Sequence, residues 1–173
     1  MSFIDRIKLH LKAGDGGSGS VSFRREKDEP HGGPDGGDGG RGGHIFIQTK
    51  NNLQSLTHLK TSTNSFKAGN GKPGIGKKKY GSAGKDLYID VPVGTIILDD
   101  NNSIKHDLNK VNQSIVIAKG GNGGFGNAKF ASSINRTPRQ ANSGKDGEAI
   151  TINLELRLIA EVGLIGVPNA GKS

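Results

Sequence analysis

Hydrophobic and polar residues alternate near the start of the chain in the way expected of a strand with one buried face. Within residues 3–12, Ile7, Leu9 and Leu11 are separated by polar or charged side chains, and a period of two residues is typical of a half-buried β-strand. Shorter β-like segments follow at residues 20–23, 44–49, 86–91, 95–98, 114–118 and 150–158. Only residues 53–59 have the pattern of a helical turn. Many short strands with turns between them predict a mainly β domain, built as a sandwich or a barrel.

Between these strands lie glycine blocks that are too long to be ordinary turns. They occupy residues 14–19, 32–43, 69–84 and 120–126. Glycine returns at every third position within residues 36–43 and again within residues 120–126. Three residues per turn is the repeat of the polyproline II helix, and glycine allows neighbouring extended helices to approach closely. The pattern predicts a bundle of glycine-rich polyproline II helices, with a flexible linker as the alternative.

Composition narrows the class of protein. Glycine and proline, with 29 and 6 residues, make up about a fifth of the 173 residues, below the roughly 25 to 30% that is typical of disordered chains. The absence of cysteine excludes a disulfide framework and a thiolate metal site. The first residues contain no uninterrupted apolar stretch. Neither a signal peptide nor a transmembrane helix is predicted, and a cytoplasmic protein is expected.

Positive charge is concentrated in two stretches of the chain. The net charge is +8, and no Asp or Glu occurs within residues 60–85 or within residues 119–145. Those stretches hold Lys60, Lys67, Lys72, Lys77, Lys78, Lys79, Lys85, Lys119, Lys129, Arg136, Arg139 and Lys145. Such segregation is typical of a protein that binds a polyanion, and phosphate contacts would weaken steeply with added salt. A solvated basic surface is the alternative.

The end of the sequence contains a phosphate-binding motif. Residues 158–165 form an apolar run typical of a buried strand, and the next eight residues match the pattern G-x-x-x-x-G-K-[S/T]. In such a loop the backbone N–H groups hold the α- and β-phosphates, Lys172 would reach the β- and γ-phosphates, and Ser173 would bind Mg²⁺. The predicted nucleotide-binding residues are Gly166, Val167, Pro168, Asn169, Ala170, Gly171, Lys172 and Ser173.

This motif divides the chain into two parts. We expect a glycine-rich domain at residues 1–158, and the first strand and P-loop of a truncated α/β P-loop GTPase domain at residues 159–173. The helix that follows a P-loop would begin at Lys172, and its N-terminal dipole is part of the phosphate site. Without that helix, and without downstream residues that orient water or recognise the base, we expect this fragment to be inactive. Catalysis would belong to a longer protein.

Five separate motifs resemble those of the Obg family of GTPases, in the same order along the whole chain. They are SFRREK at residues 22–27, GGPDGGDGGRGG at residues 32–43, VPVGT at residues 91–95, the block at residues 118–130, and residues 163–173. This resemblance implies an amino-terminal β-sandwich with a bundle of glycine-rich polyproline II helices, the Obg fold, followed by a Ras-like GTPase domain. It also implies Mg²⁺ as the cofactor with GTP, and K⁺ near Asn169, which matches the residue that potassium-assisted relatives use.

The resemblance further implies a monomeric assembly factor that docks on the large ribosomal subunit, near the peptidyl-transferase centre, through loop tips of this domain. Ribosomal RNA would be bound by Arg24, Arg25, Lys27, Lys72, Lys77, Lys78, Lys79, Lys129, Arg136 and Arg139. One departure is Asp28-Glu29, two acids beside the first three of these residues, which weakens the contact expected of that loop. The alternatives are a non-enzymatic RNA-binding module and an ATP-dependent P-loop enzyme. D-x-x-G and N-K-x-D motifs in a continuation of the chain would favour GTP.

Overall fold

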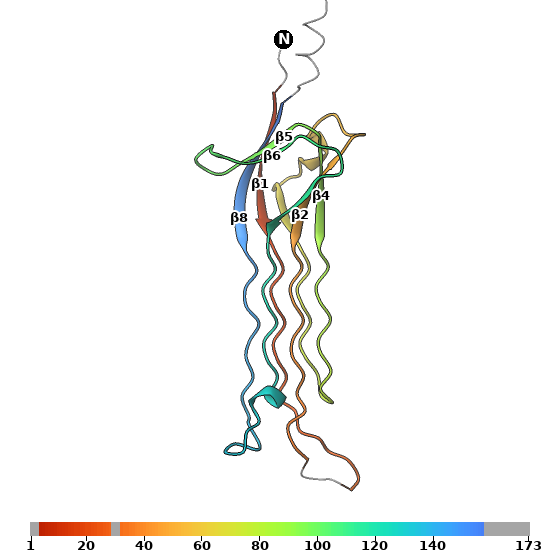
Figure 1. The fold of residues 1–173 in the computed structure, drawn as a ribbon, viewed down its shortest axis with the longest axis vertical. Coiled ribbons are helices and arrows are strands. Elements are labelled where there is room, and N and C mark those ends of the chain that lie inside the picture. Colours follow the sequence, from red (N-terminus) through yellow and green to blue (C-terminus); the bar gives the residue numbers. More distant parts are fainter. Residues whose placement is uncertain (1–3, 29–31, 158–173) are drawn as a thin grey trace, which may run out of the picture.

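The computed structural model describes residues 4–28 and 32–157 of the chain. Two β-sheets lie at one end, and long extended segments run from them to the opposite end (Figure 1). The larger sheet has the strand order β3-β1-β8-β5-β6, and the smaller sheet has the order β4-β2-β7. The elements are β1 (Ile4–Lys12), β2 (Ile45–Lys50), the 3-10 helix η1 (Thr57–Leu59), β3 (Ser65–Lys67), β4 (Leu87–Pro92), β5 (Thr95–Leu98), β6 (Ile104–Leu108), β7 (Ser114–Ala118), the 3-10 helix η2 (Asn127–Phe130) and β8 (Ala149–Arg157).

The inner faces of the two sheets form one hydrophobic core. Leu9 on β1, Ile47 on β2 and Leu154 on β8 are completely buried, whereas their neighbours along each strand are exposed or half-buried. This alternation is expected of strands whose side chains point in turn to the core and to solvent. Neither sheet closes on itself within the described residues. The predicted mainly β fold is therefore confirmed as a sandwich of two sheets, and it is not a closed barrel.

Most of the strands predicted from alternation are present, with small shifts at their ends. Residues 20–23 are the exception, because they form no strand and lead into a loop, where Phe23 forms an isolated bridge with Pro34. The predicted helical turn is confined to η1. Two strands, β3 and β6, are not predicted. β3 has only three residues, and four of the five residues of β6 are exposed, so neither shows the alternation of a half-buried strand.

Six extended segments form the bundle that runs away from the sandwich (Figure 1). They are residues 13–20, 35–43, 68–76, 79–85, 119–127 and 142–148, each leading from or into a strand. Their hydrogen bonds repeat every third residue, since the N–H groups of Gly37, Gly40 and Gly43 all donate to carbonyl oxygens within residues 68–76, at 2.7 to 2.9 Å. Three residues is the repeat of the polyproline II helix. The glycine blocks are therefore packed helices and not flexible linkers.

One layer of this bundle continues the larger sheet. Residues 68–76 donate hydrogen bonds to residues 13–20, which in turn donate to residues 142–148. The order of these three segments is the order β3-β1-β8 of the strands that they extend. The lateral order of these three bundle segments therefore follows from the order of the strands in the sheet.

The second layer continues the smaller sheet. Residues 79–85 donate to residues 35–43, which donate to residues 119–127, in the order β4-β2-β7. Each segment that runs from the sandwich to the far end of the bundle leaves one sheet. The next segment, which returns from the far end, enters the other sheet. Parallel strands need a long crossover connection, and here the excursion through the bundle supplies it. It allows β1 to pair in parallel with β3, and β2 with β4.

The helices approach so closely that the inward positions have no room for a side chain. A Cβ atom added to Gly39 would lie well inside contact distance of the carbonyl group of Gly17 in the facing segment. Side chains are accommodated at the third position of each triplet, where Asp38, Arg41 and His44 are half-buried. Glycine is therefore a steric requirement of this packing, and the triplet repeat decides which residues reach the surface.

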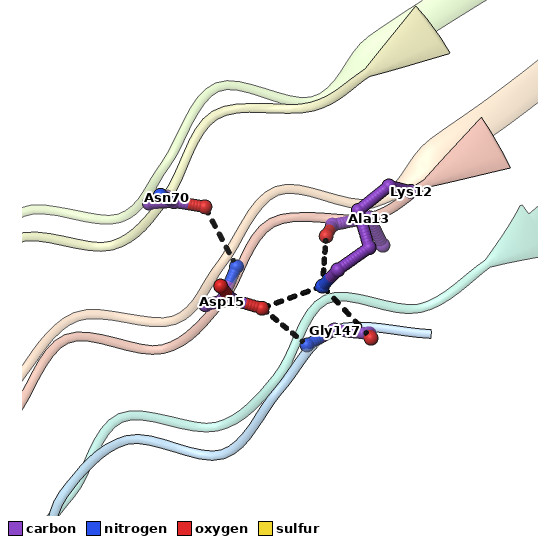
Figure 2. Close-up of polar contacts among 5 residues, drawn as sticks. All are labelled: Lys12, Ala13, Asp15, Asn70 and Gly147. Carbon is purple, nitrogen blue, oxygen red and sulfur yellow. Dashed lines mark hydrogen bonds and ion pairs between the residues drawn. The ribbon is translucent and has the colours of Figure 1, made fainter. Parts of the chain in front are cut away.

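Charged side chains brace the junction between sandwich and bundle (Figure 2). The Nζ of Lys12, at the end of β1, donates to Oδ1 of Asp15 at 2.6 Å and to the carbonyl of Gly147 at 3.1 Å. Oδ1 of Asp15 also accepts the N–H of Gly147 at 2.9 Å, and the N–H of Asp15 donates to Oδ1 of Asn70 at 2.9 Å. The hydrogen bond from Lys12, followed by that from Gly147, lowers the pKa of Asp15. Three bundle segments are thereby joined where they leave the sandwich.

Candidate nucleic-acid interface

Three loops lie at the end of the bundle remote from the sandwich (Figure 1). We name them the first tip (residues 21–28 and 32–34), the second tip (residues 76–79) and the third tip (residues 128–141). All ten basic residues predicted to contact RNA are exposed, and nine of them lie in these tips. The tenth, Lys72, lies within the bundle, where its N–H donates to the carbonyl of Ser82. The structure therefore gathers nine of the ten at one end.

Net positive charge belongs to the second and third tips. Each carries three basic residues and no acid, whereas the sequence of residues 21–34 has three acids, Glu26, Asp28 and Glu29, and the same number of basic residues. Within the first tip, Nε of Arg24 also lies 3.2 Å from Oε1 of Glu26. A polyanion is therefore attracted mainly to the second and third tips.

The second tip is a tight turn with lysines in an unusual backbone conformation. Lys77 and Lys78 have φ angles of 61° and 56°, and the N–H of Lys79 donates to the carbonyl of Gly76 at 3.3 Å. Two left-handed residues at the centre of a turn are typical of type I′, which favours Asn and Gly. Lysine side chains project from the most exposed point of the turn, at a cost in backbone free energy.

Asp35, at the start of a bundle segment, connects the second tip with the first. Its Oδ2 accepts the N–H of Lys77 at 3.1 Å, and its main-chain carbonyl accepts the N–H of Lys78 at 2.6 Å. Its own N–H donates to the carbonyl of Ser22 at 2.9 Å. Only 8% of Asp35 is exposed, and its Oδ1 is buried without a hydrogen-bond partner among residues 4–28 and 32–157. One residue thus contacts two loops, the second tip through its side chain and its carbonyl, and the first tip through its main-chain N–H.

Asn127 connects the third tip with the first in a similar way. Its side chain is completely buried, and its Oδ1 accepts the N–H of Gly36 at 2.8 Å and that of Ser22 at 3.3 Å. Its Nδ2 donates to the carbonyls of Ser22 and Pro138, both at 3.0 Å. All the hydrogen-bonding capacity of the amide is therefore used within the protein.

Two basic residues of the third tip lie against aromatic rings. Nζ of Lys129 lies 3.0 Å from Oδ2 of Asp38 and 4.9 Å from the ring centre of Phe125. The hydrogen bond and charge of Asp38 raise the pKa of Lys129. The guanidinium of Arg139 lies 5.2 Å from the ring centre of Phe23 in the first tip. These contacts restrict the motion of both cations while leaving them exposed.

A hollow of about 480 Å³ lies between the first and second tips. It is lined by Arg24, Arg25, Glu26, Gly33, Pro34, Asp35, Lys77 and Lys78. Positively charged and concave, this surface suits the phosphates of a folded nucleic acid. Aromatic residues make up only 5% of the chain, which favours recognition of phosphates and shape over stacking on bases.

Sequence reasoning identified the cations of this surface but missed the residues that hold them. Asp35, Asp38 and Asn127 sit in or beside glycine blocks, at positions where a triplet places a side chain. Their polar character was a signal, because a short acid or amide among glycines has backbone N–H groups within reach. The predicted nucleotide site, residues 166–173, and the predicted Mg²⁺ ligand Ser173 lie outside the described residues.

The fold and its tips define a class of domain, in which a β-sandwich continues into a glycine-rich bundle with basic loops at its far end. The chain belongs to the GTP1/OBG family, whose model matches residues 4–158. It is 52% identical over 172 residues to "GTPase Obg" of Thermoanaerobacter sp. (strain X514), and equally to "GTPase Obg" of Thermoanaerobacter pseudethanolicus (strain ATCC 33223 / 39E). These alignments cover 99% of the chain but 40% of each relative, so the chain spans about two fifths of their length.

The predicted fold and the resemblance to Obg proteins are thereby confirmed. A search of the described residues finds no helix with the length and apolar character needed to cross a membrane.

Proposed function

We propose that the full-length protein is a cytoplasmic GTPase that acts in assembly of the large ribosomal subunit, and that this domain docks it there by binding ribosomal RNA. The observation that carries the docking proposal is the placement of nine exposed cations in three tips at one end of a stiff bundle. Phosphate groups of RNA are the partner that such a surface fits, and the affinity would depend on salt.

The bundle contributes by holding the tips at fixed positions. Its repeated hydrogen bonds and its close-packed glycines leave the helices little freedom to bend separately. Asn127 and Asp35 then join the third and second tips to the first. A rigid array of cations loses less conformational entropy on binding than flexible side chains on a mobile loop. This arrangement favours a folded RNA of matching shape over a flexible strand.

GTP binding rests on the P-loop motif and on the family. In the full-length protein, residues 166–173 would hold the phosphates, with Lys172 at the β- and γ-phosphates and Ser173 on Mg²⁺. Asn169 would be the residue beside a K⁺ ion. The relatives' name favours GTP over ATP, and a non-enzymatic RNA-binding protein remains the second candidate because the basic tips alone would support it. Competition between GTP and ATP for the full-length protein distinguishes the two nucleotides.

The docking proposal is tested by reversing the charge of the second tip. Lys77→Glu, Lys78→Glu and Lys79→Glu together should weaken cosedimentation with purified large subunits at least about tenfold at low salt, with an unchanged melting temperature. The slope of log affinity against log salt should fall by about 2 to 3, given a slope of about 0.7 to 0.9 for each phosphate contact.

A matched control reverses three exposed lysines of the sandwich end, Lys8, Lys60 and Lys110. It changes the net charge equally but leaves the tips intact, so binding should fall much less. Equal losses in the two triple variants would show that only overall charge matters and would remove the second tip from the interface.

A further inference from the structure

Lys77 and Lys78 occupy a turn that lysine does not favour. A left-handed backbone costs a non-glycine residue roughly 1 kcal/mol or more, and here two such residues are adjacent. Asn-Gly would form the same turn more readily. The conformation therefore persists only because surrounding groups hold it in place.

Asp35 is the group that holds it. The side chain and the main chain of this one residue accept the N–H groups of Lys77 and Lys78, at 3.1 and 2.6 Å. Both lysines are exposed. A residue that binds the backbone of the turn but not its ammonium groups orients the charges without neutralising them.

Asp35 does this at a cost to the stability of the domain. It is 8% exposed, and its Oδ1 is buried with no hydrogen-bond partner in the part of the chain that the structure describes. A buried polar atom without a partner is destabilising and calls for a functional explanation. A carboxylate is also unfavourable electrostatically at the end of the molecule that the proposed function assigns to a polyanion. Orientation of the second tip accounts for its presence.

We propose that Asp35 is a positioning residue for RNA recognition. It fixes the spacing between Lys77 and Lys78 of the second tip and the two arginines of the first tip, Arg24 and Arg25, across the hollow that these four residues line. The partner that needs a fixed spacing is a folded RNA, with phosphates at set positions. A flexible single strand can adjust its own phosphates and does not need it. This inference rests on the proposed function.

The test relies on two effects of changing Asp35 that alter RNA affinity in opposite directions: the loss of its negative charge and the loss of its hold on the second tip. Asp35→Ala removes a negative charge, so electrostatics alone would tighten binding to any polyanion. If the lysines of the second tip lose their fixed position, binding to large ribosomal subunits should instead weaken about tenfold, while binding to poly(U) stays equal or becomes tighter. Asp35→Asn removes the same charge but keeps an oxygen acceptor for the N–H of Lys77, so it should bind subunits within about twofold of the unmodified protein.

Amide hydrogen exchange supplies a second measurement. Exchange at Lys77, whose N–H bonds to the carboxylate, should speed up in Asp35→Ala and stay slow in Asp35→Asn, whereas the N–H of Lys78 keeps its main-chain acceptor in both variants. Asp86→Ala is the control, because Asp86 accepts the N–H of His44 at the opposite end of the bundle; it should leave exchange at the second tip and binding to subunits unchanged. If Asp35→Ala fails to fold, Asp35→Ser takes its place, since a serine hydroxyl is too short to reach Lys77.

The outcomes separate this inference from the proposed function. Weaker binding of Asp35→Ala to subunits but not to poly(U), with Asp35→Asn retained, supports a positioning role. Unchanged subunit binding by Asp35→Ala overturns that role, and docking by the tips still stands if the triple lysine reversal abolishes binding. If neither Asp35→Ala nor the triple lysine reversal affects binding to subunits, both the positioning role of Asp35 and docking by the second tip are wrong. Equal losses for Asp35→Ala and Asp35→Asn, with exchange at Lys77 unchanged, also overturn the positioning role.

Discussion

The sandwich and the bundle extend the same chain segments, yet they are stabilised in opposite ways. In the sandwich, side chains such as those of Leu9 and Leu154 are completely buried between the sheets, and the removal of apolar surface from water is the main stabilising term. In the bundle, the inward positions are glycines, and adjacent helices are joined by backbone hydrogen bonds. The sandwich therefore depends on side chains being present, and the bundle depends on their absence.

This difference explains how function is distributed. A bundle whose inward triplet positions are glycines is narrow, and functional side chains are carried by its outward triplet positions and its tips. The sandwich, at the other end, holds six segments in register through its two sheets. The glycine segments lose more backbone entropy on ordering than other residues. The sheets offset part of this cost because they hold the ends of the segments in place.

The largest effect is expected from adding one carbon atom to the bundle. Gly39→Ala places a Cβ against the backbone of Gly17, and neither rigid backbone can move without breaking the hydrogen bonds beside it. We expect a loss of about 4 kcal/mol or more in the free energy of unfolding, because overpacking against the main chain has no rotamer that relieves it. Denaturant unfolding followed by circular dichroism measures it.

Gly33→Ala is the matched control for this prediction. A Cβ atom at Gly33, in the first tip, would meet nothing within 4 Å. The same chemical change should therefore alter stability by less than about 0.5 kcal/mol, as at other surface positions. Similar losses in the two variants would mean that helix propensity or the unfolded state, and not close packing, makes the bundle sensitive.

The repeat that makes the bundle sensitive is also what made it predictable. Glycine at every third position indicated polyproline II helices directly from the sequence, and alternation indicated the core strands. The lateral order of the segments was not predictable, since residues 13–20 and 142–148 are neighbours only because β1 pairs with β8. β3 escaped prediction for the same reason, because its three residues form a strand only beside the end of β1.

For the candidate site, the sequence predicted cations but not their geometry. Charge segregation identified Lys77, Lys78 and Arg136 without any structure. Their gathering at one end follows from the three excursions through the bundle, which sequence spacing does not reveal. The contacts of Asp35 were beyond prediction, because they join segments 42 residues apart in the chain.

A smaller loss is expected when a side chain is removed from the sandwich. Leu154→Ala should lower the free energy of unfolding by about 3 kcal/mol, within the usual range of about 2 to 5 for a buried leucine. Because every bundle segment continues a strand, both regions should still unfold in one transition. Amide hydrogen exchange tests whether the two regions unfold together: exchange at Gly40 in the bundle and at Ile47 in the sandwich should speed up by similar factors. Acceleration of Ile47 alone would show that the bundle is stable independently.

The smallest effect is expected at the junction, where the two regions meet. Asp15 is bound to Lys12 and Gly147, and these bonds hold its pKa below the usual value of about 3.9. A carboxyl whose pKa is lower in the folded state stabilises the protein above the pKa of the unfolded chain. That stabilisation is lost as the pH falls through the folded pKa.

Asp15→Asn should therefore cost less than about 1 kcal/mol at pH 7, because 38% of the carboxyl side chain is exposed and solvent screens the pair. At an acid pH below the lowered pKa of Asp15, where the carboxyl of the unmodified protein is protonated, the two proteins should approach equal stability. Urea unfolding at both pH values gives the comparison, and it isolates Asp15 because Asp86, whose pKa is also lowered by its hydrogen bonds, is common to both proteins. A difference that stays constant with pH would assign the effect to the shape of the side chain and not to its charge, and the brace at the junction would then be a hydrogen-bonded contact without an ionic contribution.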